Sequence, residues 1–254
     1  IAVVITALVL GSPLAHSQPK GATVVASEPG KVAAVTVVEA TATVVAINAM
    51  GGHLGPYSGI MAFMILPGVF VIGLLLTAAF PKLSQERLAW LALVPLLWAL
   101  NDAGPREAFR RGLVFGIAHF LSLLYWLVPT MVIYGHLPVA LSVPILFIFA
   151  AVLSLLFIAP LTCGFALAGR TPLRVLLLFP VFWVGFEYLR SFLFTGFPWE
   201  LLGYSQHARL QLIQISDIVG VYGVSGLIAF ANAALFLATL VVCRKAWRGR
   251  PVSG

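Results

Sequence analysis

A long stretch without charge constrains this chain more than any other feature. No Lys, Arg, Asp or Glu occurs from Leu113 to Gly169, and about 20 consecutive apolar residues suffice to cross a bilayer as a helix. Over the whole chain 61% of residues are hydrophobic and 9% are charged, whereas soluble domains average about 25% charged. The short segments of alternating polarity that mark membrane β-barrels are not found. We therefore expect an all-α integral membrane protein.

The apolar segments predict a polytopic bundle of about six to seven transmembrane helices. The expected spans are residues 60–79, 88–100, 113–128, 138–167, 175–194 and 218–242, with residues 31–50 as a candidate extra membrane helix. Pro144 and Pro160 predict bends in the long fourth span. Residues 1–59 remain unassigned, residues 60–245 form the expected bundle, and residues 246–254 form a basic cytoplasmic tail.

The net charge of +7 comes from three clusters of basic residues between the spans. Arg106, Arg110 and Arg111 fall in an expected loop, Arg170 and Arg174 in a second loop, and Arg244, Lys245, Arg248 and Arg250 in the tail. If the spans cross in pairs, these clusters share one side of the membrane, which the positive-inside rule assigns to the cytoplasm. The charge then reflects topology, and we expect no nucleic-acid partner.

Metal and cofactor chemistry have no support in the sequence. Cys163 and Cys243 lie in apolar surroundings, and no Cys-x-x-Cys spacing suggests a zinc cluster or a haem. His119 and His136 are isolated, and a lone membrane histidine is usually a packing residue. We expect no metal, no cofactor and no catalytic residue among these side chains.

The candidate site is the segment from Glu187 to Gln206, where an apolar helix ends in charged and aromatic residues. Glu187 and Arg190 are three residues apart, so they share a helix face and can pair. An unpaired charge at membrane depth costs about 2.5 kcal/mol or more. The candidates for substrate binding or domain docking are Glu187, Arg190, Phe194, Thr195, Gly196, Phe197, Pro198, Trp199, Tyr204 and Gln206. An ion pair that only fixes helix packing remains the alternative for the two charges.

Several motifs around this segment occur in a fixed order. They are Trp183-x-x-x-Glu187-Tyr188-Leu189-Arg190-Ser191, Phe194-Thr195-Gly196-Phe197-Pro198-Trp199, Leu202-Gly203-Tyr204-Ser205-Gln206, and Gln214-Ile215-x-Asp217-x-x-Gly220-Val221-Tyr222-Gly223. Upstream stand Leu88-Ala89-Trp90-Leu91-Ala92-Leu93-Val94-Pro95 and Tyr125-Trp126. Over about residues 75–245 the chain resembles the membrane portion of bacterial apolipoprotein N-acyltransferases.

This resemblance implies a role in lipoprotein biosynthesis in the bacterial inner membrane. The family transfers an acyl chain from a phospholipid to the α-amino group of a lipoprotein's diacylglyceryl-cysteine. It does so through a thioester on a cysteine in a nitrilase-like domain that follows the sixth span, activated by a glutamate and a lysine. Cys163 and Cys243 do not match that cysteine, so we expect the 254 residues to be inactive alone. The expected partners are membrane phospholipid and, where the catalytic domain is present, a lipoprotein. The alternative is a non-enzymatic scaffold subunit that contacts other membrane subunits.

Overall fold

The computed structural model describes residues 58–81, 83–193 and 196–252, with side chains from Ile65 onward. Over these residues the chain is helical and contains no β-strand, which confirms the all-α expectation for this part. The elements are α3 (Ser58–Thr77), the 3-10 turn η2 (Glu86–Trp90), α4 (Val94–Leu100), α5 (Pro105–Leu123), α6 (Leu127–Ile133), α7 (Val139–Leu153), the π-helical turn η3 (Ser154–Ile158), α8 (Ala159–Ala168), α9 (Pro172–Phe192), the 3-10 turn η5 (Leu202–Gln206), α10 (Leu210–Ile213) and α11 (Ser216–Val242).

The described residues contain three helical stretches that are long and apolar enough to cross a membrane. They are Val139–Ala168, Pro172–Phe192 and Ser216–Val242. The pair α5 and α6, bent by 48°, makes a fourth if it counts as one broken span. The expected six to seven spans are not confirmed, and the candidate helix at residues 31–50 lies outside the described residues.

The first basic cluster is helical, contrary to the expected loop at residues 106–112. Helix α5 begins at Pro105, and proline is favoured at the first helical position because its missing N–H would be unpaired there anyway. Arg110 and Arg111 then bond Glu107 within the same helix, at 3.3 and 2.9 Å. These i,i+3 and i,i+4 pairs favour helix over loop. The polar residues are therefore the first two turns of α5.

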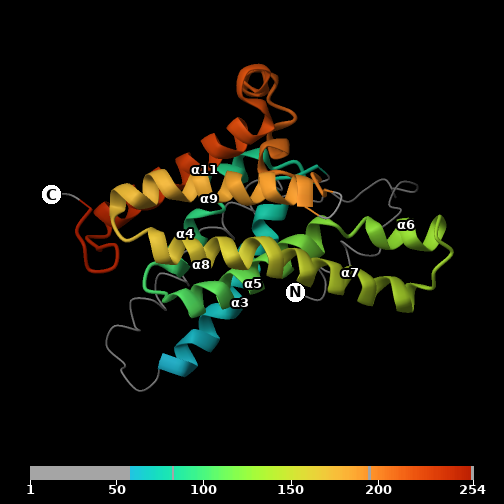
Figure 1. Ribbon diagram of the computed structural model, residues 1–254, viewed down its shortest axis with the longest axis horizontal. Helices are drawn as coiled ribbons and strands as arrows, with labels where there is room; N and C mark the ends of the chain where they lie inside the picture. Colours follow the sequence, from blue (N-terminus) through green and yellow to red (C-terminus); the bar gives the residue numbers. More distant parts are fainter. Residues whose placement is uncertain (1–57, 82, 194–195, 253–254) are drawn as a thin grey trace, which may run out of the picture.

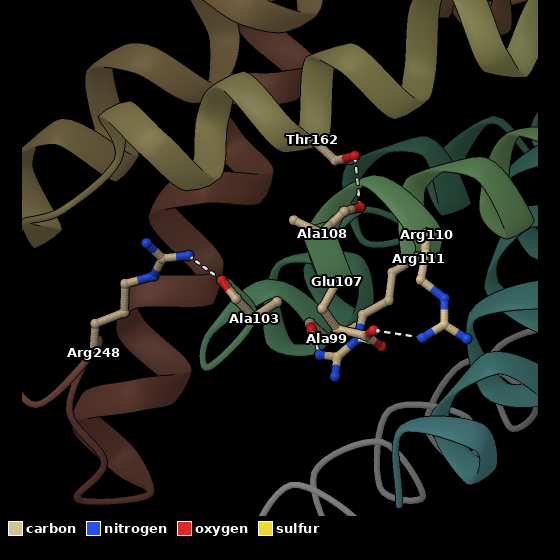
Figure 2. Close-up of polar contacts among 8 residues, drawn as sticks. All are labelled: Ala99, Ala103, Glu107, Ala108, Arg110, Arg111, Thr162 and Arg248. Carbon is tan, nitrogen blue, oxygen red and sulfur yellow. Dashed lines mark hydrogen bonds and ion pairs between the residues drawn. The ribbon is translucent and has the colours of Figure 1, made fainter. Parts of the chain in front are cut away.

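Helix α5 packs closely against η3 and α8 because two of its glycines lie at the contact. A Cβ on Gly112 would collide with Thr162, and one on Gly116 would collide with Ser154. The hydroxyl of Thr162 instead donates to the Ala108 carbonyl at 2.8 Å (Figure 2). This Gly-x-x-x-Gly spacing brings two backbones together, as in many membrane helix pairs.

The predicted bend at Pro160 takes the form of a π-helical turn. Residues Ser154–Ile158 form η3, which joins α7 to α8 in one continuous stretch. Proline removes a backbone donor and collides with the preceding turn of an α-helix. A wider π turn just before Pro160 relieves that collision. The stretch thus keeps its full length across the fold (Figure 1).

Asn232 joins α11 to the segment that runs from η2 to the start of α4. Its side chain is fully buried, accepts from the Leu93 N–H at 3.0 Å and donates to the Ala89 carbonyl at 2.8 Å. A third bond goes to the Ile228 carbonyl of its own helix at 2.9 Å. Backbone groups left open by the short 3-10 turn are satisfied in this way.

Arginines satisfy backbone carbonyls of buried residues at one end of the bundle, called the Arg248 end below. Arg248 donates to the carbonyls of Ala103 at 2.6 Å and Ala166 at 2.5 Å, and Figure 2 shows the first of these bonds. The Arg111 guanidinium reaches the Ala99 carbonyl of α4. The last carbonyls of a helix lack partners within it and attract cations. The three basic clusters therefore meet at one end, and the fully buried Trp247 ties the segment after α11 to the core.

Candidate functional site

The candidate site lies at the opposite end of the bundle, where α9 ends and the chain turns back toward α11. The backbone becomes extended at Leu193, and Gly196 has a φ of 85°. A Cβ at Gly196 would also meet the Ser191 carbonyl, so both the conformation and the space require glycine. The Phe197 N–H donates to the Arg190 carbonyl at 2.8 Å. The loop therefore begins folded against the last turns of α9.

Glu187 fixes the later part of this loop by bonding the backbone at Leu202. Its side chain is 7% exposed, and Oε1 accepts from the Trp183 indole N–H at 3.0 Å and the Leu202 N–H at 2.7 Å. The second oxygen, Oε2, is buried without a hydrogen-bond partner in the described part of the chain. The carboxylate thus serves as an acceptor for loop backbone.

Arg190 fixes the earlier part of the loop by bonding the backbone at Trp199. Its side chain is 5% exposed, and Nη1 donates to the Trp199 carbonyl at 2.9 Å. Its guanidinium carbon lies 5.4 Å from the centroid of the Phe120 ring, a cation–π contact. Among the residues with described side chains, no ion pair links Arg190 to Glu187. The two charges lie close together, but each is bonded to the loop backbone.

The loop presents aromatic rings beside the end of α5. The Trp199 side chain is 52% exposed and stacks on Trp126, with centroids 5.0 Å apart and ring planes at 23°. The ring of Phe197 stacks on that of Trp199, with centroids 6.2 Å apart. It also meets the ring of Phe149 in α7 edge-on, with centroids 5.1 Å apart. Tyr204 is 44% exposed. These rings form a row from α5 across the loop to α7.

Gln206 bonds the loop to residues of η2. It is 1% exposed, accepts from the Trp90 indole at 3.1 Å and donates to the Glu86 carbonyl at 3.0 Å. The loop is thereby fixed to η2 from a second side.

The eight candidate residues that the structure describes differ in exposure. Glu187, Arg190 and Gln206 are buried and support the loop, Gly196 and Phe197 are half-buried, and Pro198, Trp199 and Tyr204 face outward. Phe194 and Thr195 lie outside the described residues. Of these residues, the outward-facing ones are the most accessible from outside the protein.

Sequence reasoning missed Glu200, the residue directly after Trp199. It lies at the junction of two cavities: an inner one of about 20 Å³, shared with His119, Glu187 and Arg190, and an outer one of about 350 Å³, shared with Tyr125 and Trp126. Burial raises the pKa of Glu200, and Arg190 and then His207 oppose that rise. The signal was available, since a carboxylate beside an aromatic loop is unusual at the end of a membrane helix.

The inner cavity has room for about one water molecule. The outer cavity is larger and is lined by Thr77, Phe80, Pro81, Leu83, Ser122, Leu123, Tyr125, Trp126 and Glu200. No group of three or more His, Cys, Asp or Glu side chains in the described residues could hold a metal ion.

Comparison with known proteins identifies the family. The family model for the apolipoprotein N-acyltransferase N-terminal domain matches residues 72–234. The chain belongs to the apolipoprotein N-acyltransferase family. The match includes all ten candidate residues and every side chain of the two cavities.

Individual family members are similar over the same region. The apolipoprotein N-acyltransferase of Geobacter metallireducens is 45% identical over 166 residues, which are 65% of this chain and 31% of that protein. The enzymes so named from Coxiella burnetii and Pasteurella multocida are 35% and 30% identical, over 69% and 70% of this chain and 36% and 33% of theirs. The chain thus spans about a third of the length of these curated relatives.

Proposed function

We propose that this chain is the membrane domain of an apolipoprotein N-acyltransferase, and that the loop from Gly196 to Gln206 contacts the phospholipid that donates the acyl chain. The observation that carries the proposal is the row of rings around Trp199, half-exposed beside a cavity of about 350 Å³. Aromatic rings with one exposed side suit the head-group region of a bilayer. A lipoprotein and the catalytic domain would approach from the same face.

The buried charges give this face its rigidity. Glu187 and Arg190 bind the backbone of Leu202 and Trp199, so the rings are held in one arrangement before a ligand arrives. A preorganised site loses less conformational entropy on binding. We assign Glu187, Arg190 and Gln206 a positioning role, and Phe197, Pro198, Trp199 and Tyr204 the contact role. Phe194 and Thr195 belong to the same proposed segment by sequence.

The topology we propose is that of a bacterial inner-membrane protein with six passes, and a seventh if residues 31–50 also cross. The bundle would comprise residues 60–245, after an unassigned segment at 1–59 and before a tail at 246–254. Apolar composition in α3 and in α4 supports the two passes that come before α5. The basic residues gathered at the Arg248 end favour that end as cytoplasmic. The aromatic loop would then face the extracytoplasmic side.

Phospholipid binding to the purified 254-residue chain tests the contact role. Native mass spectrometry after detergent extraction would compare the parent chain with Trp199→Ala, Trp199→Phe and Tyr134→Ala. Trp199→Ala, which loses the stacked ring, should bind phospholipid about tenfold more weakly. Trp199→Phe should retain most of the phospholipid binding. Tyr134 is 79% exposed on another segment, so its variant controls for loss of any interfacial aromatic.

Equal binding by the parent chain and Trp199→Ala would refute the contact role. The scaffold alternative predicts that result, together with co-purification of other membrane subunits. A parent chain that binds no phospholipid would contradict the proposal outright.

A further inference from the structure

Glu200 has a backbone conformation that its side chain disfavours. Its φ of 57° lies in the left-handed region, where a Cβ atom is crowded and glycine is the usual occupant. Strained residues of this kind cluster at binding sites, where the surrounding structure holds a side chain in place.

Glu200 lines both cavities, and its carboxylate has no fixed partner among the described residues. The described residues provide no hydrogen bond or ion pair to it within bonding distance. Arg190 acts on it only electrostatically, since the Arg190 guanidinium is bonded to the Trp199 carbonyl. Half-buried carboxylates normally acquire donors, so this one has capacity to accept hydrogen bonds from a ligand.

The rest of the outer cavity offers aromatic faces and few other polar groups. Tyr125 and Trp126 form one wall, and Trp126 is held flat by its stack on Trp199. The hydroxyls of Thr77 and Ser122 bond each other at 2.7 Å, and Thr77 also shares a bond of 3.0 Å with His119. The hydroxyls are thus engaged within the protein, and the carboxylate is the main polar feature of the cavity.

We propose that this cavity, lined by Glu200, Tyr125 and Trp126, binds the primary ammonium group of a substrate. The ammonium donates hydrogen bonds to the Glu200 carboxylate while the electron-rich ring faces attract its charge. The same carboxylate repels phosphate and carboxylate groups. A divalent cation would need several oxygen ligands, which this cavity does not supply.

This inference rests on the proposed function and specifies its recognition step. Two substrates of such an enzyme can carry a primary ammonium: a phospholipid with an ethanolamine head group, and the free α-amino group of a lipopeptide. Both present the same chemistry to the cavity. The experiment therefore includes both.

The test uses the purified 254-residue chain with four probes. Native mass spectrometry compares phosphatidylethanolamine with phosphatidylglycerol, and a diacylglyceryl lipopeptide with its N-acetylated form. Glu200→Gln keeps the shape and removes the charge. Glu200→Gly removes the side chain and relieves the backbone strain, so it should remain folded. Asp217→Asn removes an exposed acidic residue on the same side of the bundle and serves as the control.

In the parent chain we expect the ammonium-bearing probe of at least one pair to bind more tightly. Both Glu200 variants should bind that probe about tenfold more weakly, which corresponds to about 1.4 kcal/mol. Their affinity for the ammonium-free member of the pair should be unchanged. Loss confined to phosphatidylethanolamine assigns the site to the lipid head group, and loss confined to the lipopeptide assigns it to the α-amino group.

Equal binding of both members of each pair in the parent chain overturns the ammonium site but leaves phospholipid contact standing. Equal loss of all four probes in the Glu200 variants also overturns it. A parent chain that binds no phospholipid overturns the proposed function as well, so the two failures are distinguishable.

Discussion

Replacing Glu187 tests whether this side chain stabilises the site through its charge or as a hydrogen-bond acceptor. In the structure Oε1 accepts two bonds, from the Trp183 indole and the Leu202 N–H. Oε2 has no bonding partner in the described residues. Glu187→Ala removes the acceptor and leaves two buried donors unpaired, and Glu187→Gln keeps a carbonyl oxygen where Oε1 lies. The two variants therefore differ mainly in hydrogen bonding.

The expected magnitudes follow from these bonds. Leaving a buried donor unsatisfied costs about 1–3 kcal/mol, so Glu187→Ala should lower the free energy of unfolding by about 2–6 kcal/mol. Glu187→Gln should cost about 1 kcal/mol or less because both donors keep a partner. If pairing with Arg190 were the main role, Gln and Ala would each cost about 3–5 kcal/mol, the cost of breaking a buried ion pair.

Reversible unfolding in mixed detergent–SDS micelles measures the overall effect. Hydrogen exchange at the Leu202 amide measures the local one, and it should accelerate in Glu187→Ala but not in Glu187→Gln. Ser191→Ala is a matched control, because Ser191 lies one turn further along α9 and bonds only the Glu187 carbonyl at 2.9 Å. Similar unfolding energies for the Gln and Ala variants, with rapid exchange at Leu202 in both, would refute the acceptor role.

Three further predictions concern the frame around the site. Asn232→Ala removes two bonds between segments, each worth about 0.6–1.7 kcal/mol, and should lower the unfolding free energy by about 1–3 kcal/mol in the same micelle assay; an unchanged midpoint would contradict the assigned bonds. Arg248→Lys keeps the charge but cannot reach two carbonyls at once, so the thermal midpoint should fall by an amount equivalent to about 1.5–3 kcal/mol, and an unshifted midpoint would count against that bracing. The backbone N–H of Glu86, and then Arg209 at 2.6 Å, hold the pKa of Glu86 below its usual 4.5. The stability from Glu86 is therefore present above pH 4.5 and lost as pH falls through the lowered folded pKa; Glu86→Gln should flatten the acid limb of the stability–pH profile, and an unaltered limb would exclude this contribution.

Local sequence signals predicted the helices well where they depended on neighbours in the chain. The uncharged run from Leu113 to Gly169 indicated long apolar helices, and α7 with α8 occupies most of its second half. Gly196 and Pro198, residue types that disfavour helix, lie shortly after the end of α9 at Phe192. The prediction of a loop at residues 106–112 was wrong because the polar residues were interpreted as a turn. Pro105 together with Glu107 is instead a signal for the start of a helix.

Contacts between distant segments could not be obtained from local patterns. No spacing rule indicates that Asn232 of α11 bonds the Leu93 N–H and the Ala89 carbonyl. The stack of Trp126 on Trp199 likewise joins two motifs that are far apart in the sequence. The Gly112-x-x-x-Gly116 spacing could have been recognised as a close-packing signal, but its partners, η3 and α8, follow only from the fold.

The clearest difference between sequence and structure concerns Glu187 and Arg190. Helical spacing correctly places them on one face, and that face alone suggests an ion pair. Spacing contains no information about backbone groups that return from a loop, such as the Leu202 N–H and the Trp199 carbonyl. Those groups are buried and must be satisfied, whereas two exposed partners would gain little from pairing. The charges therefore bond to the loop, and the carboxylate left for a ligand is Glu200, which helical spacing could not have identified because it lies beyond the helix.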